Sequence, residues 1–216
     1  GGTTYYFRVT STDSLGNSTT SPVAVNSPAS FGQPSFLTIW NSSVTPSTVD
    51  AGEATAVELG VKFRSDSPGT ISGVRFYKAP ANVGTHVGNL WSSDGTLLSS
   101  VTFTNETASG WQQANFASPV TIAPNTTYVV SYFTPTGHYS FNANFFAVGV
   151  DNGVLHALAN GVDGGNGVFQ YGSTSAFPNA SYNAGNYWVD VVFVESAAAP
   201  VITAVTAVPS TTSASI

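Results

Sequence analysis

The chain has 216 residues, of which only 7% are charged, and its formal net charge of −6 includes just five Lys and Arg. A surface that binds nucleic acid needs a basic stripe to displace counterions from the phosphates, so this charge balance argues against a nucleic-acid partner. The absence of cysteine removes thiol chemistry and Cys-based metal sites.

Two strands are predicted at the N-terminus, within residues 1–25. Tyr5, Phe7 and Val9 alternate with polar or basic residues, a period typical of a half-buried strand. A turn is predicted at residues 14–18, after which the chain returns as a second strand. Tyr5 follows a threonine by two residues, as in the tyrosine corner of β-sandwiches. We expect residues 1–25 to be the C-terminal fragment of a fibronectin type III-like domain.

Residues 30–196 are predicted to form one complete domain of short strands. In residues 57–63 every second residue is apolar, while residues 128–133 are apolar on both faces and indicate a central strand. The same alternation recurs in three other runs, which are residues 74–77, 97–103 and 187–193. No segment has a sustained helical period, and no apolar run approaches the roughly 20 residues of a membrane span.

Turn signals separate these runs. They lie at residues 67–69, 93–95, 123–125 and 135–137, each with a Pro-Gly, Asp-Gly, Pro-Asn or Pro-Thr-Gly pattern. The Thr-x-Tyr spacing of the first segment recurs at Tyr128. Short strands at even spacing predict an all-β fold, an antiparallel β-sandwich of jelly-roll type.

The C-terminal residues 197–216 begin as a linker of small residues. An alternating run that follows a proline predicts the first strand of another fibronectin type III or immunoglobulin-like domain. We therefore expect a segment of a longer, multidomain protein, in which neighbouring modules of the same chain are partners.

Several runs within the central domain resemble one family. The runs are Val57–Phe63, Ile71–Lys78, Gly84–Trp91, Thr102–Trp111, Thr127–Tyr132 and Asn186–Phe193. They are similar to an uncharacterised bacterial family that is catalogued only as a domain of unknown function. Its members occur in large secreted proteins beside fibronectin type III and immunoglobulin-like modules. The resemblance implies an extracellular location, secreted or attached to the cell surface, but it implies no binding residues.

No catalytic constellation is recognisable. The three histidines, His86, His138 and His156, lack the spacing of metal ligands, and the chain contains no nucleophile elbow or phosphate loop. Two carboxylates suited to glycoside hydrolysis could come from Glu58 and Asp190. Alternation places them on strand faces near Lys62 or Arg75, so we expect structural ion pairs and no enzyme activity.

An oxygen-rich stretch offers the only metal candidates. Asp151 and Asp163 lie among Asn-Gly turns, and calcium would need six or more converging oxygens. Asn-Gly favours tight turns without any ligand. We expect no cofactor, with calcium at these two residues as the open alternative.

Aromatic side chains beside amides are the remaining candidates for a ligand site. A flat ring can stack on the apolar face of a sugar while amides bind its hydroxyls. The candidates are Trp91, Trp111, Gln113, Asn115, Tyr171 and Trp188. In residues 111–116, Trp111, Gln113 and Asn115 share one face, which is amphipathic. Trp111 could equally be a platform for a ligand or a plug that closes the core.

We expect a non-catalytic extracellular module that binds polysaccharide or cell-wall glycan weakly. The alternative is a structural spacer or adhesion module with no small-molecule ligand. The two differ in one observable feature, since a binding module exposes aromatic rings beside amides, whereas a spacer buries all four tryptophans.

Overall fold

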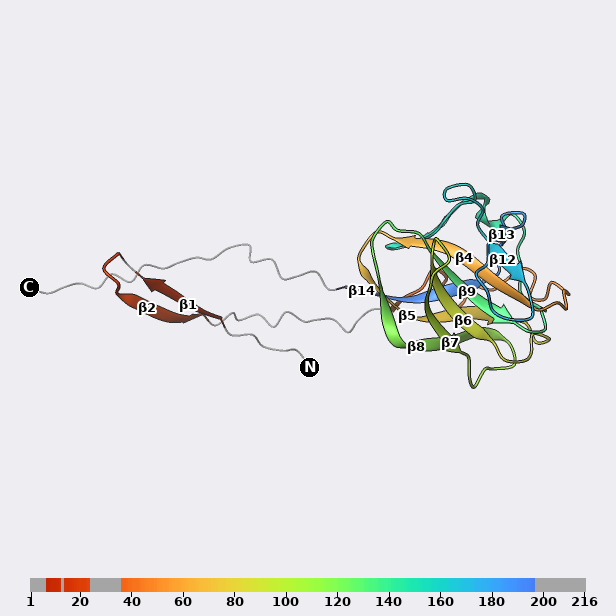
Figure 1. Ribbon diagram of the computed structural model, residues 1–216, viewed down its shortest axis with the longest axis horizontal. Coiled ribbons are helices and arrows are strands. Elements are labelled where there is room, and N and C mark those ends of the chain that lie inside the picture. Colours follow the sequence, from red (N-terminus) through yellow and green to blue (C-terminus); the bar gives the residue numbers. More distant parts are fainter. Residues whose placement is uncertain (1–6, 13, 24–35, 197–216) are drawn as a thin grey trace, which may run out of the picture.

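A computed structural model describes residues 7–12, 14–23 and 36–196. In the first part, β1 (Phe7–Thr12) and β2 (Ser18–Val23) pair as an antiparallel hairpin around the predicted turn. Tyr5 and the strand expected within residues 197–216 lie outside the described residues. Residues 36–196 contain all the other strands and form two sheets (Figure 1).

The larger sheet has eight strands, in the order β10-β11-β4-β9-β6-β7, with β12 also paired to β4 and β13 paired to β12. Its strands are β4 (Val57–Ser65), β6 (Val87–Ser92), β7 (Leu97–Thr102), β9 (Tyr128–Thr134), β10 (Val150–Asn152), β11 (Leu155–Ala157), β12 (Val168–Tyr171) and β13 (Ala180–Ser181). Strand β9 lies between β4 and β6 and is buried along its whole length, which confirms the predicted central strand.

The smaller sheet has four strands in the order β3-β14-β5-β8. They are β3 (Phe36–Leu37), β5 (Gly69–Lys78), β8 (Gly110–Ile122) and β14 (Val189–Glu195). Every pairing among the described strands is antiparallel. The predicted all-β, antiparallel sandwich is therefore confirmed. The chain crosses between the sheets from β4 to β5, from β5 to β6 and from β7 to β8, as a jelly-roll-like arrangement requires.

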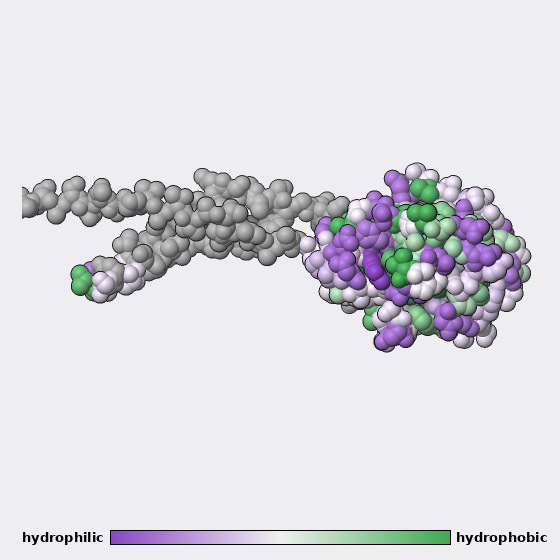
Figure 2. Space-filling model, turned by 90° about the horizontal axis from the view of Figure 1, so that it is seen from above, coloured by the Kyte–Doolittle hydropathy of each residue, from purple (hydrophilic) through white to green (hydrophobic). Residues whose placement is uncertain are grey.

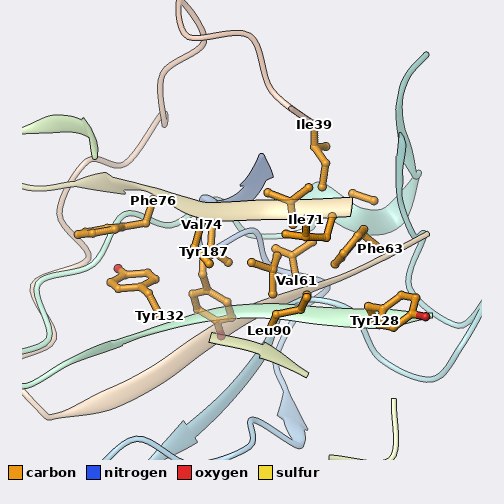
Figure 3. Packing of buried hydrophobic residues seen from close by; sticks show 14 of the residues in the cluster. Ile39, Val61, Phe63, Ile71, Val74, Phe76, Leu90, Tyr128, Tyr132 and Tyr187 are labelled. Carbon is orange, nitrogen blue, oxygen red and sulfur yellow. The ribbon is translucent and has the colours of Figure 1, made fainter. Parts of the chain in front are cut away.

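The inward faces of the two sheets form the core. Phe76, Val74 and Ile71 point from β5 toward side chains of the larger sheet, and Phe76 stacks on Tyr132 with 4.2 Å between ring centroids (Figure 3). The alternation predicted for residues 57–63 is confirmed on this face, because Val57, Leu59, Val61 and Phe63 all belong to the core.

Tyr128 forms the tyrosine corner that its sequence spacing predicts. Its hydroxyl accepts a hydrogen bond of 3.1 Å from the backbone N–H of Ala123, five residues upstream. This bond ties the start of β9 to the connection that precedes it.

Helical structure is minimal. The short 3₁₀ helix η1 (Phe145–Ala147) is the single helix among the described residues, and that part of the chain has no helix able to span a bilayer. The face drawn in Figure 2 carries separate hydrophobic groups set among hydrophilic side chains.

Segments outside the strands cover both outward faces of the sandwich. On the larger sheet, Phe177, which lies in the loop after β12, packs against Trp91, Val129 and Val168. On the smaller sheet, Trp40 packs against Trp188 with 5.8 Å between ring centroids. These covering segments decide where the surface stays open.

Candidate ligand-binding site

Strand β8 presents the predicted amphipathic face on the outside of the smaller sheet. Gln112 and Phe116 are buried on one side, whereas Gln113 and Asn115 are exposed on the other and Trp111 is half-buried there. Residues that alternate along a strand lie on opposite faces of the sheet. The grouping of Trp111, Gln113 and Asn115 on one face is therefore confirmed.

These three side chains line an open hollow of about 640 Å³. It extends across the outward face of the sheet, from β8 through β5 and β14 to β3. The other lining residues are Phe36, Thr38, Ser42, Arg75, Gln112 and Val192. Its volume lies within the range of about 300–1,000 Å³ that is usual for small-molecule sites.

Arg75 occupies the middle of this face and is held from several sides. Its guanidinium group lies 3.6 Å from the carboxylate of Asp190 on β14, and its Nη2 donates to Ser42 Oγ at 3.2 Å. Asp190 is buried and also accepts the backbone N–H of Ile39 at 2.7 Å. The opposite charges of Arg75 and Asp190 compensate each other, so the hollow has no strong net charge from this pair.

Burial shifts the pKa values of both Arg75 and Asp190. Desolvation raises the pKa of Asp190 to about 7, even though Arg75 and backbone N–H groups act in the opposite direction. Desolvation also lowers the pKa of Arg75, while Asp190 opposes that shift. Desolvation thus disfavours the charged form of both groups, and the attraction between them only partly offsets this cost.

Trp111 contacts both the aromatic cluster and the hollow. The Arg75 guanidinium carbon lies 4.5 Å from its ring centroid, within the range of a cation–π contact. Its Nε1 donates to the Val44 carbonyl at 2.9 Å, and its ring meets Trp40 and Trp188 at 6.5 and 6.2 Å. One part of Trp111 therefore closes an aromatic cluster, and another part borders the hollow.

The two amides lie next to each other at the rim. Gln113 Nε2 donates to Asn115 Oδ1 at 3.1 Å, so the remaining amide atoms of this pair are a carbonyl acceptor and an NH₂ donor. Gly73 on β5 makes room for this arrangement, because a Cβ at residue 73 would lie 2.7 Å from Asn115 Oδ1. The hollow thus sets the Trp111 indole, with Arg75 over its ring, beside a donor and an acceptor.

Two predicted site residues do not lie on an accessible surface. Trp188 is only 2% exposed, and its Nε1 donates to Asn142 Oδ1 at 2.9 Å beneath the aromatic cluster. Trp91 is 7% exposed on the other sheet and donates to Ser131 Oγ at 2.7 Å. Trp188 was a candidate ligand-binding residue, but it is buried against Trp40 and does not border the hollow.

The expected ion pair of Glu58 was also wrong, whereas that of Asp190 with Arg75 is present. Glu58 is fully buried and accepts hydrogen bonds from neutral groups: Asn89 Nδ2 at 2.8 Å, Ser175 Oγ at 2.7 Å and Ser131 Oγ. Desolvation raises the pKa of Glu58 to about 7, and these hydrogen bonds only partly oppose it. The side chain of Lys62 points elsewhere, to the Asp163 carbonyl.

The other candidate residues lie apart from the hollow. Tyr171 lines a separate, smaller pocket with Glu53. Asp151 pairs with His156 at 2.7 Å, and Asp163 pairs with Arg64 at 3.3 Å. Within the described parts of the chain, His, Asp and Glu side chains form no group of three or more that could hold a metal ion.

The histidines each have a carboxylate partner. His86 and His138 contact Glu106 and Asp50 at 2.8 and 3.1 Å, respectively. Desolvation lowers the pKa of the buried His86, although Glu106 opposes this shift. All three histidines are thus placed in ion-pair geometry, each with a different carboxylate partner.

Sequence reasoning missed the far wall of the hollow. Phe36, Thr38 and Ser42 come from a short segment with no strand periodicity long enough to interpret. Only the pairing of β3 with β14 brings this segment against β8 residues that lie about 70 positions later. The alternating polarity of β5 and β14 did indicate that Arg75 and Asp190 lie on the strand faces opposite the apolar side chains.

One family model matches the chain. The family model described as "Domain of unknown function (DUF4082)" matches residues 43–189, which include β4 to the first residue of β14 and most of the hollow. No curated protein sequence matches the chain significantly.

Proposed function

The chain belongs to the DUF4082 family, whose description names no activity, and we propose that its sandwich is a non-catalytic module that binds a neutral glycan in the hollow beside Trp111. We also propose that it acts outside the cell, as one module of a secreted or surface-attached bacterial protein. Its few charges and many Ser, Thr and Asn residues support that setting.

The observation that carries the proposal is the position of Trp111 next to Gln113 and Asn115 in one hollow. A pyranose ring has an apolar face that favours contact with an indole and hydroxyls that need donors and acceptors. The two amides and the Thr38 and Ser42 hydroxyls supply such groups. Because Arg75 is compensated by Asp190, a neutral sugar suits the site better than an acidic one.

Binding without hydrolysis is supported by the composition of the lining. Glycosidases place two carboxyl groups across the scissile bond. Among the described residues that line the hollow, none has a carboxyl side chain, and Asp190 lies buried behind Arg75.

A structural spacer remains the second candidate because of one observation. Three of the four tryptophans, Trp40, Trp91 and Trp188, are buried, as expected for a spacer. Only Trp111 borders an open surface, so the choice between the two functions depends on whether this hollow takes a ligand.

Calorimetric titration of the chain with soluble neutral polysaccharides, and with a polyuronate as the acidic counterpart, tests the proposal. We expect saturable binding of at least one neutral glycan. Gln113→Ala and Asn115→Ala should each weaken it about three- to tenfold, the effect of one lost hydrogen bond. Both residues are exposed, so the melting temperature should hardly change.

Asn179→Ala is the matched control, because it removes an exposed amide far from the hollow's lining. It should bind glycan like the parent chain. Absence of saturable binding to every neutral glycan, with the protein folded, would reject the proposal and favour the spacer.

A further inference from the structure

Side chains of β4 and β12 line a second pocket. Strand β12 pairs with β4, and β13 pairs with β12 on its other side (Figure 1). The pocket has a volume of about 270 Å³, and Val57 and Leu59 of β4 are at its base. Its remaining lining consists of one carboxylate and five aromatic rings, which are Glu53, Tyr139, Phe169, Tyr171, Tyr182 and Tyr187. It shares no residue with the hollow beside Trp111.

The rings are inclined to one another and do not stack in parallel. Phe169 meets Tyr171 at 5.5 Å and 69°, and it meets Tyr187 at 6.3 Å and 68°. Tyr139 meets Tyr187 at 5.6 Å and 75°. Rings in edge-to-face contact turn their faces in different directions, so together they surround a space from several sides.

The pocket is open to solvent through two tyrosines. Tyr171 is 43% exposed and Tyr182 is 59% exposed, whereas Tyr187 is buried. Exposed aromatic rings that lie together at the mouth of a pocket can mark a ligand-binding site. A small ligand could enter over Tyr182 and reach the buried ring of Tyr187.

Glu53 gives the pocket a negative character. Tyr171 donates its hydroxyl hydrogen to Glu53 Oε2 at 3.4 Å, and Tyr139 is hydrogen-bonded to Tyr171. Burial raises the pKa of Tyr139, Tyr171 and Tyr187, so these phenols keep their protons at neutral pH. Neutral rings present the negative face of their π-systems to a ligand.

No basic side chain is among the described residues that line this pocket. The nearest basic group along the chain is His138, whose backbone N–H donates to the Glu53 carbonyl. Its ring is paired with Asp50 at 3.1 Å. The carboxylate of Glu53 is therefore available to compensate a positive charge on a ligand.

We propose that this pocket binds a trialkylammonium group, as found in choline and its small-molecule derivatives. A quaternary ammonium cation has no N–H to satisfy and is attracted to the faces of several aromatic rings at once. A calcium ion would need six or more oxygen ligands, and this lining offers a single carboxylate. The volume, slightly below that of usual small-molecule sites, suits such a head group better than an oligosaccharide.

Calorimetric titration of the chain with tetramethylammonium and choline tests this assignment. 3,3-Dimethyl-1-butanol is the matched control ligand, because it has the shape of choline with carbon in place of the charged nitrogen. We expect saturable binding of both cations and at least tenfold weaker binding of the neutral alcohol. Phosphocholine and phosphatidylcholine vesicles, added as separate arms, distinguish a free head group from one attached to a lipid.

Three substitutions identify the pocket as the site. Tyr171→Leu and Tyr182→Leu each remove an exposed ring and should reduce the affinity at least tenfold. Glu53→Gln keeps the shape and removes the charge, and it should reduce the affinity about fivefold. Phe36→Leu is the matched control, since it removes an exposed ring at the other hollow and should leave cation binding unchanged.

Equal binding of choline and its neutral isostere would overturn the proposal and leave a merely apolar pocket. So would the absence of saturable cation binding by the folded chain, or an affinity that Tyr171→Leu and Tyr182→Leu leave intact. The glycan proposal concerns a different sheet face, and these outcomes do not affect it.

Discussion

The two sheets both bury a carboxyl group on the face that turns away from the core, but they compensate it differently. On the smaller sheet, Asp190 pairs with Arg75. On the larger sheet, Glu58 is surrounded by hydroxyl and amide groups and has no basic partner within hydrogen-bonding distance among the described residues. Burial raises both pKa values to about 7.

The comparison shows that the covering segments, more than the strands, decide which face is open. On the larger sheet, Phe177 from the loop after β12 packs against Trp91, Val129 and Val168. On the smaller sheet, the segment that contains Trp40 covers Trp188 but leaves Gln113 and Asn115 uncovered. The hollow of about 640 Å³ lies on the outward face of the smaller sheet, where the covering segment leaves these amides exposed.

Removing Arg75, the basic partner of Asp190 on the smaller sheet, should have the largest effect on stability. Arg75→Leu leaves Asp190 buried without its partner, and we expect the free energy of unfolding at pH 7 to fall by about 3–5 kcal/mol. Arg64→Leu is the control, because it breaks an ion pair with Asp163 whose side chains are 32% and 42% exposed. That change should cost at most about 1 kcal/mol.

Urea unfolding of both variants measures the difference. Equal losses of stability in Arg75→Leu and Arg64→Leu would contradict the structural importance assigned to the buried pair.

The pH dependence of stability should report the titration of Glu58, the buried carboxyl group on the larger sheet. Because the folded-state pKa of Glu58 is about 7 and its ordinary value is 4.5, the folded protein holds a proton that the unfolded chain loses first. This contribution to stability is complete below about pH 4.5 and is lost as the pH rises through about 7. Glu58→Gln should therefore reduce the fall in stability between pH 5 and pH 8 by about 3 kcal/mol.

Urea unfolding at pH 5, 6, 7 and 8 gives the profile. Glu195→Gln, at an exposed position at the end of β14, controls for the loss of one carboxyl charge. If Glu58→Gln and the parent chain had parallel profiles, the titration of Glu58 on folding would be refuted. Asp190 and His156 account for a decline that remains in the variant, because the pKa of each is also raised in the folded protein.

Substituting one tryptophan on the outward face of each sheet should give the smallest losses of stability. Trp91→Phe removes a buried donor to Ser131 Oγ and leaves a small cavity, so we expect a loss of about 2–3 kcal/mol. Trp111→Phe removes the donor to the Val44 carbonyl at a half-exposed position and should cost about 1 kcal/mol. Thermal melts of the two variants compare them directly, and a greater loss for Trp111→Phe would reverse the order proposed for the two faces.

Local patterns were enough to predict the sandwich and one face of the site. The period of two in residues 57–63 identified the core side of β4, and the same period in β8 grouped Trp111 with Gln113 and Asn115. These features depend on neighbours along one strand, which the sequence displays directly.

Burial of the other tryptophans could not be predicted in this way. Trp188 packs against Trp40, which lies about 150 residues away in the sequence. The backbone of Trp188 is itself left-handed, with a φ of 56°. The partners of Glu58 come from three separate segments, around Asn89, Ser131 and Ser175. Such contacts depend on how covering loops fold over a sheet, for which single-strand periodicity gives no signal.

Strand β8 also has a consequence for how the protein behaves at high concentration. It is a long edge strand that pairs with β5 on one side, and within residues 36–196 no further strand continues the sheet beyond it. Unpaired backbone groups at such an edge are a template for association with another chain. Pro119 interrupts this row, because proline lacks the N–H that an incoming strand would need. Resistance to edge-to-edge aggregation therefore depends in part on a residue that contributes nothing to the hollow on the same strand.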